Sequence, residues 1–240
     1  MSKDISVILT AYNEASEIEA TLDALAAAFP GAPVWVADDG STDATALLAR
    51  RAGARVVRSE RMIGKGGAAT TAAREALRLA RVDGGEEDRV ATGEEQQESI
   101  FILCDGDLAE SAGRLGALAD AVRRGETDMA VAVFATRVGG GVGLAVAFAR
   151  WAIRRRCGLE LRAPISGQRA LRAGVLADVL PFAAGFGMEI GMTIDAARAG
   201  HSVSEIELDL SHRVTGRTFA GFAHRGRQLI DFVRVYFARR

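Results

Sequence analysis

The sequence SIFILCDGDL, residues 99–108, is an apolar run that ends at two acids, Asp105 and Asp107, with one glycine between them. An uncharged run of this length is typical of a strand that is buried on both faces, as in a parallel sheet. Two neighbouring carboxylates repel each other. A strand end that places them together therefore predicts a partner from outside the chain.

Short apolar runs alternate with helical patterns along the first half of the chain. The apolar runs are ISVILT (5–10), PVWVAD (33–38), ARVV (54–57), SIFILC (99–104) and DMAVAVF (128–134), and helical spacing marks residues 16–28, 43–52 and 67–81. This alternation is typical of strands that are joined by crossover helices. It predicts an α/β fold with a Rossmann-like, mostly parallel sheet flanked by helices.

The second half has a different pattern, which begins after GGGVG (139–143). The spacing predicts a helix over 144–157, a turn over 163–168, a helix around 187–199, a strand over 203–208 and a last helix from about residue 220. The polar and acidic residues 82–99 predict a solvated loop in the first half. The chain length suits one continuous domain, with halves at 1–135 and 136–240.

Composition and charge exclude several classes of protein. The formal net charge is -1 at pH 7, so no global field attracts nucleic acid, and we expect no nucleic-acid partner. Cys104 and Cys157 are too few for a disulfide framework. The sequence has no basic-then-apolar start and no apolar stretch long enough to span a bilayer. We therefore expect a cytoplasmic protein that at most lies on the inner face of the membrane.

Polar residues follow four of the predicted strands. They are AYNE (11–14), DDGSTD (38–43), GKGG (64–67) and DGD (105–107). Because ligands of an open α/β sheet gather at the carboxyl ends of its strands, we expect one polar crevice there. The first of these ends lacks the G-x-G-x-x-G turn of dinucleotide-binding folds. A P-loop would require glycine at position 59 and Ser or Thr at position 66, where this chain has Ser59 and Gly66. The sequence therefore predicts neither a dinucleotide-binding site nor a P-loop.

The acids and the lysine at these strand ends suit a nucleotide and a metal ion. Asp105 and Asp107 could bind one hard divalent cation, because Mg²⁺ takes one or two carboxylates together with phosphate oxygens; alternatively they are solvated turn acids. Asp38 and Asp39 could bind a base or ribose, or they form a polar turn into the next helix. Lys65 between glycines suits a phosphate, and its alternative is a solvated loop residue.

The motifs SVILTAYNEASEIEATL, VWVADDGSTDAT, GKGGA and LCDGDL, in this order and spacing, resemble the nucleotide-sugar-binding half of family 2 glycosyltransferases of the GT-A fold. The resemblance implies that residues 1–135 bind a nucleotide-sugar donor. It places Ala11, Tyr12, Glu14 and Asp39 around the base, Lys65 near the base or phosphates, and Asp105 and Asp107 at the diphosphate and a Mg²⁺ or Mn²⁺ ion.

Two resemblances compete in residues 136–240, the predicted acceptor-binding half. FARWAIRRRCGLELRAPISGQRAL (148–171) resembles polyprenyl-phosphate sugar transferases such as dolichol-phosphate mannose synthases, in which Arg169 would hold phosphates. PFAAGFGMEIGMTIDAARAG (181–200) and SHR (211–213) resemble glucosyl-3-phosphoglycerate synthases, a retaining family. This second resemblance implies that His212 joins the metal site and that Arg213 lies near phosphates. The two resemblances imply different reaction outcomes.

Asp107 and Glu189 are the catalytic candidates. Asp107 would hold the metal ion that clamps the leaving diphosphate. Glu189 lies among apolar residues of a predicted helix, so it is either a helix-start acid or a carboxylate that faces the crevice. It would orient the substrate or take a proton from an alcohol acceptor, whereas a phosphate acceptor needs no base. His212, alternatively, is a structural histidine.

Residues 221–240 predict an amphipathic helix. Its apolar side chains fall largely on one side and its five arginines mostly elsewhere, a pattern that suits an anionic membrane surface. The alternative is a helix that packs on the sheet or on a second subunit, as in a homodimer.

We expect a metal-dependent hexosyltransferase that uses a nucleotide diphosphate donor, UDP-glucose by resemblance. The acceptor is expected to carry phosphate, as a polyprenyl phosphate or a small phosphorylated acid. One alternative is a nucleotidylyltransferase, whose glycine-rich, Arg-containing turn would stand where this chain has Tyr12-Asn13-Glu14. Another is a non-catalytic protein that binds sugar nucleotides.

Overall fold

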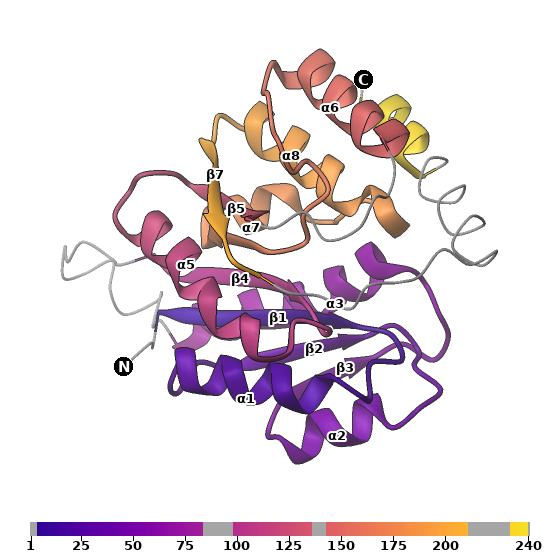
Figure 1. Cartoon of the computed structure of the whole chain (residues 1–240), viewed down its shortest axis with the longest axis vertical. Coiled ribbons are helices and arrows are strands. Elements are labelled where there is room, and N and C mark those ends of the chain that lie inside the picture. The colour runs from indigo at the N-terminus through magenta and orange to yellow at the C-terminus, as the bar shows by residue number, and fades with distance from the viewer. Residues whose placement is uncertain (1–3, 84–97, 136–142, 211–230, 240) are drawn as a thin grey trace.

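The computed structural model describes residues 4–83, 98–135, 143–210 and 231–239, and in this part of the chain one seven-stranded sheet has the order β3-β2-β1-β4-β6-β5-β7 (Figure 1). The strands are β1 (Ile5–Ala11), β2 (Val34–Asp38), β3 (Arg55–Arg58), β4 (Ile100–Asp105), β5 (Met129–Phe134), β6 (Arg169–Arg172) and β7 (Val203–Leu208). The pairs β1 with β2, β1 with β4, β2 with β3 and β5 with β7 are parallel. Only β6 is antiparallel to its described neighbours, β4 and β5. The prediction of an α/β fold with a mostly parallel sheet is confirmed.

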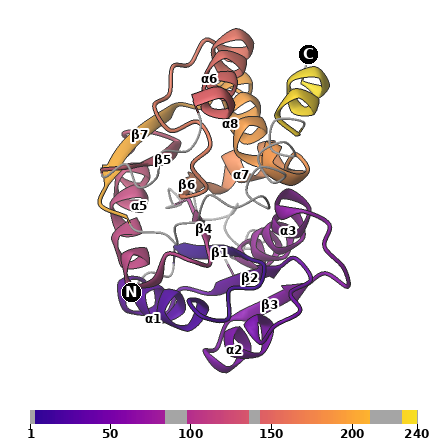
Figure 2. The ribbon, with the colours of Figure 1, turned by 45° about the vertical axis from the view of Figure 1, so that its right-hand side comes forward.

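Helices cover both faces of this sheet (Figure 2). One face carries α1 (Ile18–Ala28), α2 (Thr45–Arg51), the 3-10 helix η1 (Ala109–Leu115) and α5 (Gly116–Arg123). The other face carries α3 (Lys65–Asp83), α7 (Ala173–Val179) and α8 (Met188–Arg198), with the short η2 (Gly185–Gly187) just before α8. Strand β1 is buried between the layers: Val7 and Leu9 face the α1 side, and Ile8 faces the α3 side.

The helices pack on the sheet through regularly spaced apolar side chains. In α1 the buried residues Ile18, Leu22 and Leu25 recur at helical spacing. Each such side chain stabilises the fold by about 1.5–3 kcal/mol when it is fully buried. Helix α3 instead presents buried alanines, from Ala68 to Ala76, to the sheet. Small side chains allow its backbone to lie close to the strands, which fixes the position of its first residue, Lys65.

The short strand β6 and the helix α7 that follows it were not predicted. The sequence pattern predicts only a turn over 163–168 and then nothing until the helix near 187. Strand β6 has four residues and begins with Arg169, which is completely buried. A charged residue argues against a buried strand, because burial of a charge is costly unless the group is hydrogen-bonded. Because Arg169 interrupts the apolar pattern, the sequence did not indicate this strand.

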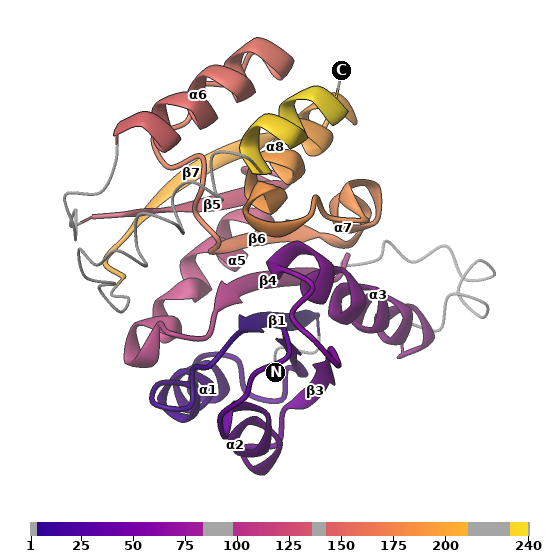
Figure 3. The same ribbon diagram turned by 90° about the vertical axis from the view of Figure 1, so that its right-hand side faces the viewer.

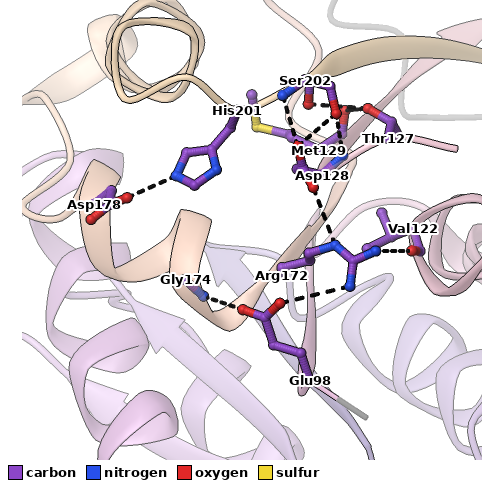
Figure 4. Close-up of polar contacts among 10 residues, drawn as sticks. All are labelled: Glu98, Val122, Thr127, Asp128, Met129, Arg172, Gly174, Asp178, His201 and Ser202. Atoms are coloured by element: carbon purple, nitrogen blue, oxygen red, sulfur yellow. Dashed lines mark hydrogen bonds and ion pairs between the residues drawn. The ribbon is translucent and has the colours of Figure 1, made fainter. Parts of the chain in front are cut away.

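A polar network joins β6 to the amino ends of β4, β5 and β7 (Figure 4). The Arg172 guanidinium lies 3.3 Å from Asp128, 3.7 Å from Glu98 and 3.0 Å from the Val122 carbonyl oxygen. Hydrogen bonds from Ser202 lower the pKa of Asp128. These contacts hold the end of the sheet that lies opposite the carboxyl ends of its parallel strands.

Two further helical segments pack beyond the sheet (Figure 3). They are α6 (Gly143–Cys157) and residues 231–238, and together with α8 they form a separate apolar cluster in which Phe232 and Val235 are buried. Residues 221–230 of the predicted last helix lie outside the described residues, and its described part packs on other helices and not on the sheet. None of the helices in the described part of the chain is long and apolar enough to cross a lipid bilayer.

Glycines allow the last helix to lie close to η2 and α8. A Cβ atom at Gly185 would overlap the Asp231 carboxylate, and one at Gly187 would overlap the Val235 side chain. A Cβ atom at Gly191 would lie 2.9 Å from Cζ of Arg239. The Arg239 guanidinium also donates to both carboxylate oxygens of Asp195 at 2.7 Å. The last helix is thus fitted against the segment that carries Glu189.

Candidate active site

The loops after β1 and β2 are joined by side chain to backbone hydrogen bonds. Asn13 has a positive φ of 57°, and its side-chain oxygen accepts a hydrogen bond from the Thr42 backbone N–H at 2.8 Å. The Asn13 and Glu14 backbone N–H groups donate to the hydroxyls of Ser41 and Thr45. Asp43 accepts from the Thr45 N–H in the first turn of α2. The two strand ends predicted to bind the base therefore form one ordered surface, from which Tyr12 is 41% exposed.

Asp39 connects this surface to the loop before α3. Its carboxylate accepts hydrogen bonds from the Ile63 N–H at 2.7 Å and the Gly64 N–H at 3.0 Å. Burial raises the pKa of Asp39, although these two bonds oppose the shift. The backbone N–H of Asp39 donates to the Ala11 carbonyl oxygen at 3.0 Å. Ala11, Asp39 and the loop that leads to Lys65 are consequently held together.

The turn between Asp105 and Asp107 is held by the backbone of β1 and by α1. The Gly106 N–H donates to the Thr10 carbonyl oxygen at 2.9 Å. The buried Thr21 hydroxyl donates to the Gly106 carbonyl oxygen and accepts from the Ala109 N–H, both at 2.9 Å. The two aspartates follow a fixed turn, and both are partly exposed at the carboxyl end of β4.

Lys65 brings together acids from two distant parts of the chain. Its Nζ lies 2.7 Å from Oδ1 of Asp105 at the end of β4 and 2.7 Å from Oε1 of Glu189 in the first turn of α8. The side chain of Glu189 is 7% exposed, and those of Lys65 and Asp105 are 22% and 31% exposed. We call these three residues the Lys65 cluster.

Two polar residues that the sequence did not single out complete the contacts of Asp105. The Thr10 hydroxyl donates to Oδ1 at 2.9 Å, and the buried Gln168 side chain donates to Oδ2 at 2.8 Å. Gly167 makes room for this arrangement, because a Cβ atom there would lie 2.7 Å from both Asp105 Oδ2 and Lys65 Nζ. Gln168 directly precedes β6. Because the sequence pattern did not predict this strand, it did not single out Gln168 either.

Electrostatic interactions keep Lys65 and Asp105 ionised. Burial alone would lower the pKa of Lys65, but the charges of Asp105 and Glu189 outweigh it and hold this pKa above its usual value. Burial alone would raise the pKa of Asp105, but Lys65 outweighs it and lowers the pKa. The neighbouring Cys104 differs, because burial raises the pKa of its thiol and keeps it protonated. A protonated thiol is a poor nucleophile.

Arg169 differs from the expectation that it would hold phosphates. The residue is completely buried, and its guanidinium donates to the Ser166 carbonyl oxygen and the Thr193 hydroxyl, both at 2.9 Å. Burial lowers its pKa to about 10. Arg169 thus joins the 164–168 turn to α8 beneath the surface, and its contacts support the positions of Gln168 and Glu189.

Two predicted ligands, His212 and Arg213, lie outside the described residues. Within the described ranges, no group of three or more His, Cys, Asp and Glu side chains is arranged to hold a metal ion. The Lys65 cluster and Asp107 nevertheless contribute one positive and three negative groups at one place. Such a site attracts cations, and its oxygen donors are the type that Mg²⁺ and Mn²⁺ prefer.

Comparisons with known proteins agree with this architecture. Residues 6–78 match the family model for glycosyl transferase family 2. No curated protein gives a match to the chain. Among solved structures, glucosyl-3-phosphoglycerate synthase from Mycobacterium tuberculosis in complex with phosphoglyceric acid is 26% identical, with a TM-score of 0.73 over 98% of this chain and 79% of that chain.

Two other complexes of the same synthase are similar to this chain. The complex with Mn²⁺, UDP-glucose and phosphoglyceric acid has 26% identity and a TM-score of 0.71 over 98% of this chain and 79% of that chain. The complex with Mg²⁺ and UDP has 26% identity and a TM-score of 0.70 over 98% and 78%. The resemblance of the second half to glucosyl-3-phosphoglycerate synthases is confirmed. The protein is a glycosyltransferase of the GT-A fold, and its match to the family 2 model covers residues 6–78.

Proposed function

We propose that this protein transfers glucose from UDP-glucose to a phosphate-bearing acceptor in the presence of Mg²⁺ or Mn²⁺. The observation that carries the proposal is the Lys65 cluster, which joins the predicted donor half, residues 1–135, to the predicted acceptor half, residues 136–240. The support for the ligands comes from similar structures, which contain Mn²⁺, UDP-glucose and phosphoglyceric acid.

In this proposal the first half of the chain binds the nucleotide. Tyr12, Glu14 and Ala11 lie on the ordered surface formed by the loops after β1 and β2 and contact the base. Asp39 fixes the loop before α3, so that Lys65 is presented to the donor at the start of a helix. Helix starts favour negative groups, which suits a diphosphate.

The donor set at the end of β4 fits a divalent metal ion. Asp105 and Asp107 supply carboxylate oxygens on a fixed turn, and His212 would add a ring nitrogen. A bound Mg²⁺ or Mn²⁺ would neutralise charge on the departing diphosphate. Thr10, Lys65 and Gln168 hold the Asp105 oxygens in place, and Asp107 follows on the same fixed turn, so we assign both carboxylates to the metal.

Glu189 and Lys65 act as a pair in this proposal. The ion pair orients the Glu189 carboxylate toward the end of β4, where the sugar must lie between diphosphate and acceptor. Glu189 then holds the sugar or acceptor by hydrogen bonds. If the acceptor reacts through a hydroxyl group, Glu189 is also the carboxylate in place to accept its proton.

For the acceptor we favour a small phosphorylated acid over a polyprenyl phosphate. The favouring observation is that the chain is similar over 98% of its length to a synthase in complex with phosphoglyceric acid. Arg169, the residue that would bind lipid phosphate by resemblance, is buried and bonded within the protein. Arg213 is the remaining candidate for the acceptor phosphate.

Release of UDP tests this proposal directly. The protein is incubated with UDP-glucose or GDP-mannose, with Mn²⁺, Mg²⁺ or EDTA, and with phosphoglycerate, a polyprenyl phosphate or no acceptor. We expect metal-dependent UDP release that phosphoglycerate accelerates, and we expect Asp107→Ala to abolish it. Asp120→Ala, which removes an exposed acid of α5, is the matched control, because Asp120 pairs with Arg123, whose other partner, Asp4, lies at the amino end of β1. Unchanged release with Asp107→Ala would refute the assignment of this residue.

A further inference from the structure

Two helices that are far apart in the sequence place four aromatic rings on one surface. In α6 the Phe148 and Trp151 ring centroids are 5.5 Å apart, and Trp151 lies 4.8 Å from Tyr236 of the last helix. Tyr236 in turn lies 5.4 Å from Phe237. Figure 3 shows these two helices side by side at the end of the molecule distant from α1 and α2.

The outer rings of this group remain exposed. Trp151 is 45% exposed and Phe237 is 53% exposed, whereas Phe232, on the inner side of the same helix, is 1% exposed. The last helix therefore already has an apolar side that packs against the protein. The exposed rings of Trp151 and Phe237 form a second apolar area.

Arginines surround these rings. Arg154 and Arg155 are exposed on α6, and the Arg234 side chain on the last helix is 77% exposed. The Arg156 guanidinium stacks on the Tyr236 ring at 3.8 Å from its centroid. Two acids pair with arginines of this group: Glu160 lies 3.7 Å from Arg154, and Asp231 lies 3.6 Å from Arg234. We call this region of α6 and residues 231–238 the aromatic-arginine surface.

Aromatic rings and arginines together match the boundary between lipid headgroups and acyl chains. Trp and Tyr concentrate at that depth, and arginine side chains extend along apolar surface while their charged ends reach anionic headgroups. Basic residues near an anionic membrane strengthen binding to it. A second copy of the chain fits less well, because a two-fold interface would bring two copies of this arginine-rich surface against each other.

We propose that the aromatic-arginine surface binds an anionic lipid bilayer, with Trp151 and Phe237 inserted and the arginines at the headgroups. This binding is separate from sugar transfer, since neither aromatic residue belongs to the Lys65 cluster or its contacts. This binding requires the helices to lie on the membrane surface and not to cross it. It agrees with the finding that no helix in the described part of the chain is long and apolar enough to span a bilayer.

The full chain is tested by co-sedimentation with vesicles of phosphatidylcholine alone and with added phosphatidylglycerol. We expect binding to the anionic vesicles only, weakened by salt. A Trp151→Ser/Phe237→Ser variant should bind at least about tenfold more weakly. Leu47→Ser, which alters a 50% exposed apolar residue of α2, should bind as the unmodified protein does.

Tryptophan fluorescence gives an independent readout, because the chain has two tryptophans and Trp35 is buried. Emission from Trp151 should move to shorter wavelength on addition of anionic vesicles, and Trp151→Phe should remove the shift. Circular dichroism checks that each variant is folded. Absence of vesicle binding by the unmodified chain would overturn the proposal. Concentration-dependent dimers that only the Trp151→Ser/Phe237→Ser variant loses, without vesicle binding, would assign the surface to a second copy.

Discussion

Lys65 is the residue at which the two halves of the chain meet. The sequence placed it near a phosphate, and the structure shows its ammonium group between Asp105 and Glu189. The ammonium group of a lysine is a compact point charge, so one Nζ atom can contact two carboxylates at once. Part of the repulsion at the end of β4 is therefore already relieved within the chain, and a divalent ion has to balance only the remainder.

Replacement of Lys65 by Met should damage both activity and stability. Asp105 and Glu189 would lose their shared cation, which should lower the free energy of unfolding by about 1–3 kcal/mol. Sugar transfer should fall by about 100-fold or more, because charge stabilisation at the diphosphate is lost. Urea unfolding and UDP release measure the two effects. Equal activity of Lys65→Met and the unmodified protein would contradict this role.

The stability difference between these two proteins should depend on pH. The pKa of Asp105 is lowered in the folded protein, so its contribution is fully present above the unfolded value of 3.8 and is lost as the pH falls through the lower folded value. The advantage of the unmodified protein over Lys65→Met should therefore be constant near neutral pH and shrink in acid. Urea titrations over a series of pH values measure it, and a difference that grows in acid would contradict the assigned ion pair.

At the scale of elements, the start of α3 is fixed by contact with the segment before α8. The Thr70 hydroxyl donates to the Gly66 carbonyl oxygen at 2.7 Å and accepts from the Phe182 N–H at 3.0 Å. A Cβ atom at Gly66 would overlap the Ala183 carbonyl oxygen. The distance from Lys65 to Glu189 depends on this close approach of two backbones.

A single methyl group at Gly66 should consequently separate the Lys65 cluster. In Gly66→Ala the overlap is with backbone, which cannot move aside cheaply, so we expect a loss of about 1–3 kcal/mol in stability and at least tenfold in transfer. The matched control is Gly116→Ala at the start of α5, where φ is -52° and no atom lies within 4 Å of the added Cβ. Thermal unfolding and UDP release compare the two variants. A Gly66→Ala protein as active as the control would refute the argument.

Sequence patterns predicted elements well where burial and polarity followed simple periods. The strands 5–10, 99–104 and 203–208 were placed within one residue at each end, because they are buried apolar runs or lie between clear turns. The pattern failed at β6, where a buried arginine interrupts the apolar signal. The contact of Gln168 with Asp105 could not be predicted for the same reason, because it depends on β6 lying beside β4. The contact of Thr10 with Asp105 depends instead on the register between β1 and β4, in which these two residues are partners.

At the scale of the whole molecule, β6 joins the two predicted halves into one sheet. It pairs with β4 on one side and with β5 on the other, although it comes later in the chain than both. The residue 135 boundary thus separates β4 and β5 from the strand that lies between them. We propose that the chain unfolds as one cooperative unit. The contacts of Arg172 with Glu98 and Asp128 help to hold it together at the amino ends of β4 and β5.

A fragment of residues 1–135 should therefore fail to fold independently. Strand β4 is buried over Ile100–Cys104 and would expose one edge, while β5 would lose both of its described neighbours. Exposed apolar edges promote aggregation. Circular dichroism and size-exclusion chromatography of the fragment and of the full chain make the comparison. A soluble fragment with a cooperative urea transition would show that the halves are separable.

The fit of the last helix against η2 and α8 has a practical consequence for work with this protein. Arg239 is bonded to Asp195 of α8, the helix that carries Glu189 in its first turn. An affinity tag fused after Arg240 would begin within two residues of that bond and beside the exposed Phe237. A tag before β1 is the better choice, since assays with a carboxyl-terminal fusion would measure the disturbance together with the enzyme.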